Sequence, residues 1–271
     1  MPIRIPSAFG ALPFNKQDSI DAFAFHDDFI NAALLADLVD GTGVLYNGDY
    51  DWFGTEIAGA AVSNVTKVAV VADHPGIIQL KAGSTSPADG DAAALQFGRD
   101  GAAVQESVLL DGNGVYIAAV IRIPDVDAQK VEFGFCGQAP AAVNSSALDI
   151  VSLAWDPEDA ANVGDVWFLG QVNDAGTDSE VVLNDVDYVQ NDWVLLEIAA
   201  DDASATFRVT TEDGSSTETL QPTTGMPLVG LRPFISVENV GAAEEVVDID
   251  AFQIRYLRRN TPYGTSGYLG A

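Results

Sequence analysis

The alternation of apolar and polar residues is clearest between Asn191 and Gly214. Residues 193–199 are rich in large apolar side chains, and a polar turn follows at residues 200–204. From residue 205 to 211, Phe207 and Val209 alternate with polar neighbours that include Arg208. Because successive side chains of a strand point to opposite faces, this pattern predicts an antiparallel hairpin with Phe207 and Val209 in a core and Arg208 in solvent. Such a hairpin needs a second layer to cover its apolar face.

Similar short apolar runs, separated by turn residues, occur along most of the chain. Besides the hairpin we expect strands at residues 23–29, 65–71, 77–81, 93–97, 107–110, 114–122, 130–136, 148–155, 165–172, 180–182, 232–238 and 246–256, and a short helical turn at residues 31–39. Pro75-Gly76 and Asp111-Gly112 mark two of the turns between them.

No repeat of fixed period and no linker-like change of composition divides the chain. The pattern therefore predicts one all-β domain, an antiparallel two-sheet jelly-roll sandwich over residues 23–256. Residues 1–22 combine three prolines with irregularly spaced apolar residues and are expected to form an extended N-terminal arm. Residues 257–271, rich in Gly and Tyr, are expected to form a second arm.

The predicted arms and the predicted sandwich also differ in charge. The chain has 40 acidic and 12 basic residues and a net charge of −28 at pH 7, yet residues 1–20 and 255–271 together hold five basic residues and one acidic residue. The negative body disfavours nucleic acids and membranes as partners. Basic ends on an acidic body are typical of docking peptides, although a merely solvated tail would have the same composition. The residues expected to dock on a partner are Arg4, Ile5, Phe9, Phe14, Arg255, Arg258, Arg259, Tyr263 and Tyr268.

Few residues of the sequence indicate a catalytic, metal-binding or cofactor-binding site. Cys136 is the single cysteine, which excludes an intrachain disulfide, and its apolar neighbours predict a buried side chain. Phosphate loops, nucleophile elbows and zinc motifs are absent from the sequence, as are a signal peptide and an apolar run long enough to cross a bilayer. We therefore expect no cofactor. A structural Ca²⁺ would suit the loop oxygens of Asp111, Asn113, Asp156, Glu158, Asp159 and Asp165.

Aromatic residues are dense between Leu45 and Phe53. Such a cluster either stacks on the faces of sugar rings or packs in a core or between subunits. The candidate stacking residues are Tyr46, Tyr50, Trp52 and Phe53.

Three stretches resemble concanavalin A-like lectin/glucanase sandwiches, and the resemblance covers roughly residues 23–256: Phe25-His26-Asp27-Asp28-Phe29, the run Asn191–Ile198 before a strand with Phe207, and Val247–Ile254. The resemblance implies that the first and last strands pair and bring Asp28 near Asp250. The glucanase signature Glu-x-Asp-x-x-Glu is absent from the sequence, so the resemblance does not imply glucan hydrolysis.

The stretch His74–Thr85 is similar to a segment of sandwich proteins in tailed-bacteriophage particles. That similarity implies a non-enzymatic structural protein of a virion, such as a capsid decoration or cement protein or a head or tail fibre component, assembled in the host cytoplasm. Its partners would be the major capsid protein, tail subunits or further copies of itself in a homo-oligomer.

Two alternatives remain at this stage. One is a lectin-like module that recognises a host glycan through the aromatic cluster. The other is a glycosidase, because Asp248 and Asp250 are expected on one face of the last strand.

Overall fold

The computed structural model describes residues 22–27, 43–44, 52–58, 64–67, 76–83, 87–97, 108–110, 114–137, 149–158, 167–174, 176–223 and 225–257. These residues form sixteen β-strands. The predicted helical turn at residues 31–39 and most of both predicted arms, residues 1–21 and 258–271, lie outside the described ranges.

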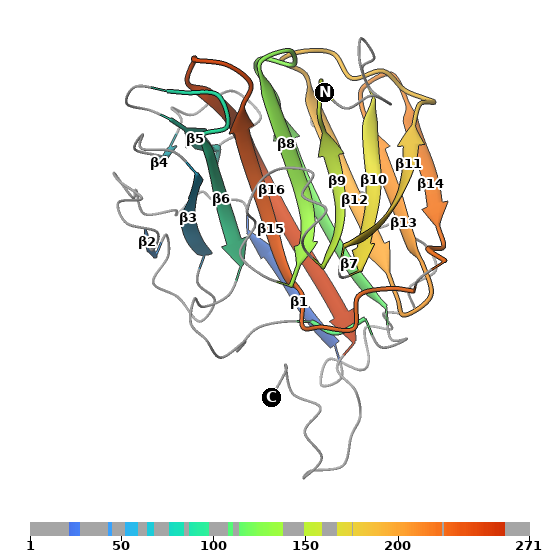
Figure 1. Ribbon diagram of the computed structural model, residues 1–271. Helices are drawn as coiled ribbons and strands as arrows, with labels where there is room; N and C mark the ends of the chain where they lie inside the picture. The colour runs from blue at the N-terminus through green and yellow to red at the C-terminus, as the bar shows by residue number, and fades with distance from the viewer. Residues whose placement is uncertain are drawn as a thin grey trace.

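The strands form two eight-stranded antiparallel sheets that face each other (Figure 1). Sheet A has the order β14 (Ser215–Leu220), β13 (Ala205–Thr210), β12 (Trp193–Ala200), β7 (Val115–Arg122), β16 (Glu245–Leu257), β5 (Ile78–Ala82) and β4 (Asn64–Lys67), and β1 (Ala22–Asp27) also pairs with β16. Sheet B has the order β11 (Thr177–Leu183), β10 (Phe168–Asp174), β9 (Ile150–Trp155), β8 (Gln129–Cys136), β15 (Arg232–Asn239), β6 (Ala92–Phe97), β3 (Trp52–Ala58) and β2 (Gly43–Val44). The predicted all-β, two-sheet sandwich is confirmed.

The core lies between the sheets, where alternate residues of facing strands meet. Its large buried side chains include Phe133, Phe135, Trp155, Phe207 and Phe252. The rings of Phe133 and Phe252, from opposite sheets, meet edge to face with centroids 6.3 Å apart. Gly170 makes room for Phe207 across the core, because a Cβ at position 170 would lie 2.5 Å from the Phe207 ring.

The predicted hairpin is confirmed as β12 and β13, with Phe207 and Val209 buried in the core. The prediction that Arg208 lies in solvent is wrong, because its side chain is only 25% exposed and lies near Glu197 of β12. The polar turn is held by Asp201, whose Oδ1 accepts hydrogen bonds from the backbone N–H groups of Ala203 and Ser204. The error arises because Arg208 lies against the buried Glu197 on the outer face of sheet A instead of extending into solvent.

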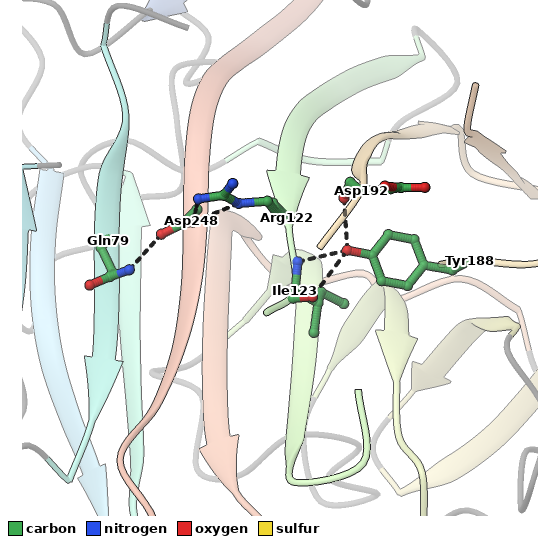
Figure 2. Close-up of polar contacts among 6 residues, drawn as sticks. All are labelled: Gln79, Arg122, Ile123, Tyr188, Asp192 and Asp248. Atoms are coloured by element: carbon green, nitrogen blue, oxygen red, sulfur yellow. Dashed lines mark hydrogen bonds and ion pairs between the residues drawn. The ribbon is translucent and has the colours of Figure 1, made fainter. Parts of the chain in front are cut away.

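Residues 184–192 lead from sheet B to sheet A and are anchored by Tyr188. The Tyr188 hydroxyl accepts a hydrogen bond from the backbone N–H of Ile123 and donates one to the carbonyl of Asp192, both at 2.8 Å (Figure 2). Its ring packs edge to face on Trp155 and Phe168 of sheet B. Tyr188 thus ties the crossing segment to strands of both sheets.

The first and last strands pair, as the family resemblance implied. The register sets Ala22 opposite Leu257 and Asp27 opposite Phe252. Asp28, which was expected near Asp250, lies outside the described residues. The described ranges contain no helix long and apolar enough to cross a membrane.

Candidate functional site

The predicted carboxylate pair of the last strand is split by an irregularity. The register of β16 on β7 shifts between Ile249 and Ala251, so Asp250 falls at a bulge and the expected alternation from Asp248 to Asp250 is broken. Asp248 itself is bound on both sides, since Gln79 Nε2 donates to its Oδ1 at 2.7 Å and Arg122 Nε to its Oδ2 at 2.9 Å (Figure 2). The Asp248 carboxylate is 1% exposed, so it is a buried structural anion rather than a group presented to substrate.

Arg122 extends this row of residues across sheet A. The register places Trp193, Arg122, Asp248 and Gln79 side by side on four neighbouring strands. The Arg122 guanidinium lies over the Trp193 ring, 5.1 Å from its centroid, and its Nη2 is 2.5 Å from Asp248 Oδ2. The row joins β12, β7, β16 and β5 through side chains in addition to their backbone ladders.

A second buried carboxylate, Glu197, lies on the same outer face. Tyr116 donates a hydrogen bond to its Oε1 at 2.8 Å, and Arg208 Nε is 3.7 Å from its Oε2. Burial raises the pKa of Glu197, against the opposing effects of the Tyr116 hydrogen bond and the Arg208 charge. Burial and the neighbouring Glu197 likewise raise the pKa of Tyr116. Glu197 is fully shielded from solvent, so this cluster offers no open site.

Two of the predicted Ca²⁺ ligands instead bind a side-chain cation. The Lys130 ammonium lies 3.5 Å from Asp156 Oδ2, 2.9 Å from Glu158 Oε2 and 3.8 Å from Glu238 Oε1. Burial lowers the pKa of Lys130, but the hydrogen bond to Glu158 and the charges of Asp156 and Glu238 outweigh burial, and the net shift is upward. No group of three or more His, Cys, Asp or Glu residues in the described ranges is arranged to hold a metal ion. Asp111, Asn113, Asp159 and Asp165 lie outside those ranges.

The outer face of sheet B carries both polar and apolar residues. One cross-strand row runs over seven strands and is made of Phe53, Gln96, Phe234, Gly134, Ser152, Gln171 and Glu180. In its centre Ser152 is fully buried and donates a hydrogen bond of 2.5 Å to Glu132 Oε1 from the neighbouring strand. Cys136 also lies on this face and is buried, as the sequence predicted. The centre of the face is therefore closed to solvent.

The row reaches solvent at its β10–β11 end, where Glu180 is exposed. Here Trp167, Gln171, Asn173, Asp178 and Glu180 form what we call the β10–β11 strip. Trp167 directly precedes the core residue Phe168, so the alternation of β10 places it on the outer side with Gln171 and Asn173. Trp167 is half-buried, while Asp178 and Glu180 are exposed.

Hydrogen bonds fix the polar groups of the strip. The Trp167 indole N–H donates to Asp187 Oδ1 at 3.0 Å, and Gln171 Nε2 donates to Glu180 Oε1 at 3.3 Å. Asn173 is 2% exposed, and its Oδ1 accepts from the Gly176 N–H at 2.9 Å while its Nδ2 has no hydrogen-bond partner. A buried amide donor without a partner is costly unless a water or ligand satisfies it. The strip thus combines one accessible aromatic, two exposed carboxylates and an unsatisfied donor.

The structure places only a few of the residues singled out in the sequence. Trp52 and Phe53 lie in β3, where the register sets Phe53 opposite Gln96 in the polar row. Arg255 lies in β16 opposite Tyr116 and is half-buried. The other docking residues and Tyr46 and Tyr50 lie outside the described residues. Sequence reasoning missed Trp167, although its alternation with Leu169 and Gln171 in the predicted strand 165–172 was the available signal.

A scan of protein-family models gives no match, and a search of curated proteins gives none either. Among solved structures, peanut lectin is similar with a TM-score of 0.54 and 13% identity, covering 87% of this chain and 97% of the lectin. The seed lectin of Lotus tetragonolobus has a TM-score of 0.50 and 13% identity, covering 88% of this chain and 100% of the lectin. The fold is that of the legume lectins.

This lectin-like sandwich also occurs in a bacteriophage protein. The CBM2 module of the evolved Dit of Lactobacillus casei BL23 phage J-1 is similar with a TM-score of 0.50 and 14% identity, covering 90% of this chain and 99% of the module. All three similarities extend over nearly the whole of the matched proteins, so they concern the complete sandwich rather than a shared hairpin.

Proposed function

We propose that this chain is a non-enzymatic carbohydrate-binding module that binds an extended glycan along the β10–β11 strip. The observation that carries the proposal is Trp167, a half-buried indole at the start of β10 whose N–H is held by the exposed Asp187. Support comes from the lectins and the phage CBM2 module, which have the same fold.

The chemistry of the strip suits sugars. An indole face packs on the apolar face of a pyranose ring, and a few fixed amides and carboxylates bind its hydroxyl groups. The hydrogen bond between Gln171 and Glu180 fixes the exposed Glu180 carboxylate, and the buried Asn173 Nδ2 is a donor without a partner. From Trp167 to Asn173 the strand spans about 20 Å, a length that suits several consecutive sugar units rather than a single one.

We expect the substitution Trp167→Ala to abolish retention of the protein on polysaccharide columns while leaving it folded. Truncation removes the stacking surface and the indole hydrogen bond to Asp187, which lies on the protein surface. Affinity electrophoresis or column retention against a panel of polysaccharides measures the effect, with circular dichroism as the check of folding. Trp193→Ala is the matched control, since Trp193 is also half-buried but lies on the outer face of the opposite sheet. Equal retention of the Trp167→Ala variant and the unsubstituted protein would rule out the strip as the binding site.

We further propose that the module belongs to a bacteriophage virion. Supporting observations are the phage CBM2 module, which the sandwich matches over 99% of its length, and the stretch His74–Thr85. The terminal arms would dock on neighbouring subunits, with the major capsid protein, tail subunits or further copies of the chain as partners. Both arms join the sandwich at adjacent positions, because Ala22 and Leu257 are directly paired.

Removal of residues 1–21 and 258–271 is expected to leave a folded sandwich that no longer assembles. The arms carry basic residues that would complement an acidic neighbour, whereas residues 22–257 hold the strands of both sheets. Light scattering reports the oligomeric state, and co-sedimentation with candidate phage shells or tails reports docking. A trimmed protein that assembles and sediments like the full chain would contradict the docking role but leave glycan binding untouched.

A further inference from the structure

The β10–β11 strip belongs to an acidic part of the chain. Between residues 174 and 220 the sequence holds twelve acidic residues and a single basic one, Arg208. Arg208 faces Glu197 on sheet A and does not belong to the strip. Asp178, Glu180, Asp185 and Asp187 are all exposed along β11 and the segment that follows it.

These carboxylates lie along the strip. Asp178 and Glu180 are two residues apart on the outward-facing side of β11 and are therefore about 7 Å from each other. Asp187 lies at the other end, bound to the Trp167 indole. Negative charge is thus distributed along the whole length over which a glycan would lie.

Such a surface discriminates between glycans by charge. Uronate and sulfate groups would be repelled by the local carboxylates and by a net charge of −28. An ammonium group would instead form charge-assisted hydrogen bonds with the carboxylates, and beside Trp167 it would also be attracted by the indole face. Asn173 Nδ2 is buried on the same side of β10 and has no hydrogen-bond partner, so a water or ligand hydroxyl that reached it would satisfy this donor.

From this arrangement we infer that the ligand is a polysaccharide with free amino groups, such as a de-N-acetylated glucosamine polymer. The inference rests on the proposed function and names the ligand class of the same strip. Trp167 stacks on a sugar ring, and the exposed carboxylates of Asp178, Glu180 and Asp187 bind ammonium groups.

The test compares chitosan oligosaccharides with fully N-acetylated chitin oligosaccharides of the same length, which differ only in their amino groups. Isothermal titration calorimetry at a pH where the amines are protonated should give at least about tenfold tighter binding of the chitosan oligomer, and added salt should reduce that preference. Alginate oligosaccharides serve as the anionic member of the panel and are expected not to bind.

Variants distinguish binding at the strip from a general attraction between a polycation and an acidic protein. Glu180→Gln and Asp187→Asn should each reduce the preference for chitosan, and Trp167→Ala should abolish it. Asp127→Asn is the matched control, because Asp127 is equally exposed but lies between β7 and β8. If all four variants bind chitosan like the unsubstituted protein, the attraction is diffuse and the inference is overturned. Equal affinity for the acetylated and deacetylated oligomers overturns it as well but leaves glycan binding intact, whereas no retention on any polysaccharide removes the proposed function itself.

Discussion

Replacing Arg122 by methionine is expected to lower the free energy of unfolding by about 3–5 kcal/mol. The reason is the asymmetric burial of the ion pair, in which the Asp248 side chain is 1% exposed and that of Arg122 is 26% exposed. Without Arg122, the Asp248 carboxylate stays buried and keeps the hydrogen bond from the Gln79 amide. Asp248→Asn should cost less, about 1–3 kcal/mol, because the guanidinium left behind can reach water. Urea unfolding followed by tryptophan fluorescence measures both values.

Two further variants make this result specific. Lys81→Met removes an ion pair of similar length in the same sheet, Lys81 Nζ to Glu244 Oε1 at 3.1 Å, but that pair is solvent-accessible and should cost less than about 1 kcal/mol. The double variant Arg122→Met, Asp248→Leu should be more stable than Arg122→Met alone, because no buried charge remains. A larger loss for Asp248→Asn than for Arg122→Met would contradict this account of the row.

Glu245→Gln is expected to stabilise the protein at pH 8 and to have little effect at pH 4. Burial of Glu245 and repulsion from Asp125 and Glu244 raise its pKa from 4.5 to about 7. The folded state therefore binds more protons than the unfolded chain between about pH 4.5 and 7, and the free energy of unfolding falls as the pH rises through that window. The loss amounts to about 3 kcal/mol above pH 7, and the glutamine variant avoids it.

Thermal or denaturant unfolding of both proteins across this pH range gives the difference curve. Asp125→Asn provides a second check, because loss of that charge should move the midpoint of the Glu245 effect to lower pH while keeping the titrating carboxyl. The Asp125 Oδ1 that accepts the Asp127 N–H has an equivalent oxygen in asparagine, so the turn is retained. A stability difference that does not change with pH would show that Glu245 is not the responsible group.

Period-two alternation was sufficient to predict the architecture. Phe207 and Val209 face the core because the apolar side of a strand must be covered, and that rule depends only on local sequence. A strand without a clear apolar side was missed: β14, Ser215–Leu220, consists of polar residues except for Leu220. The strand predicted at residues 107–110 is wrong in its extent, because in the described residues 108–110 it is reduced to an isolated bridge between Val108 and Leu231.

The polar clusters depend on register between distant strands, which alternation does not encode. Gln79, Arg122 and Asp248 are far apart in the chain and meet because β5, β16 and β7 pair in one particular alignment. The bulge after Ile249 also followed from pairing, and it removed the predicted Asp248 and Asp250 arrangement. The contact between Trp167 and Asp187 also depends on the pairing of β11 with β10, because Asp187 follows β11 in the chain.

The pairing of Ala22 with Leu257 has a consequence for how such a sandwich can be built into larger proteins. Opposed residues of an antiparallel pair have Cα atoms about 5 Å apart, so the chain enters and leaves the sandwich at nearly one point. A surface loop of a host protein could therefore be opened between two neighbouring residues and receive the whole sandwich with its ends hardly displaced. The module is in this sense transferable as a unit, and a permuted chain with Ala22 and Leu257 joined by a short turn should fold to the same two sheets.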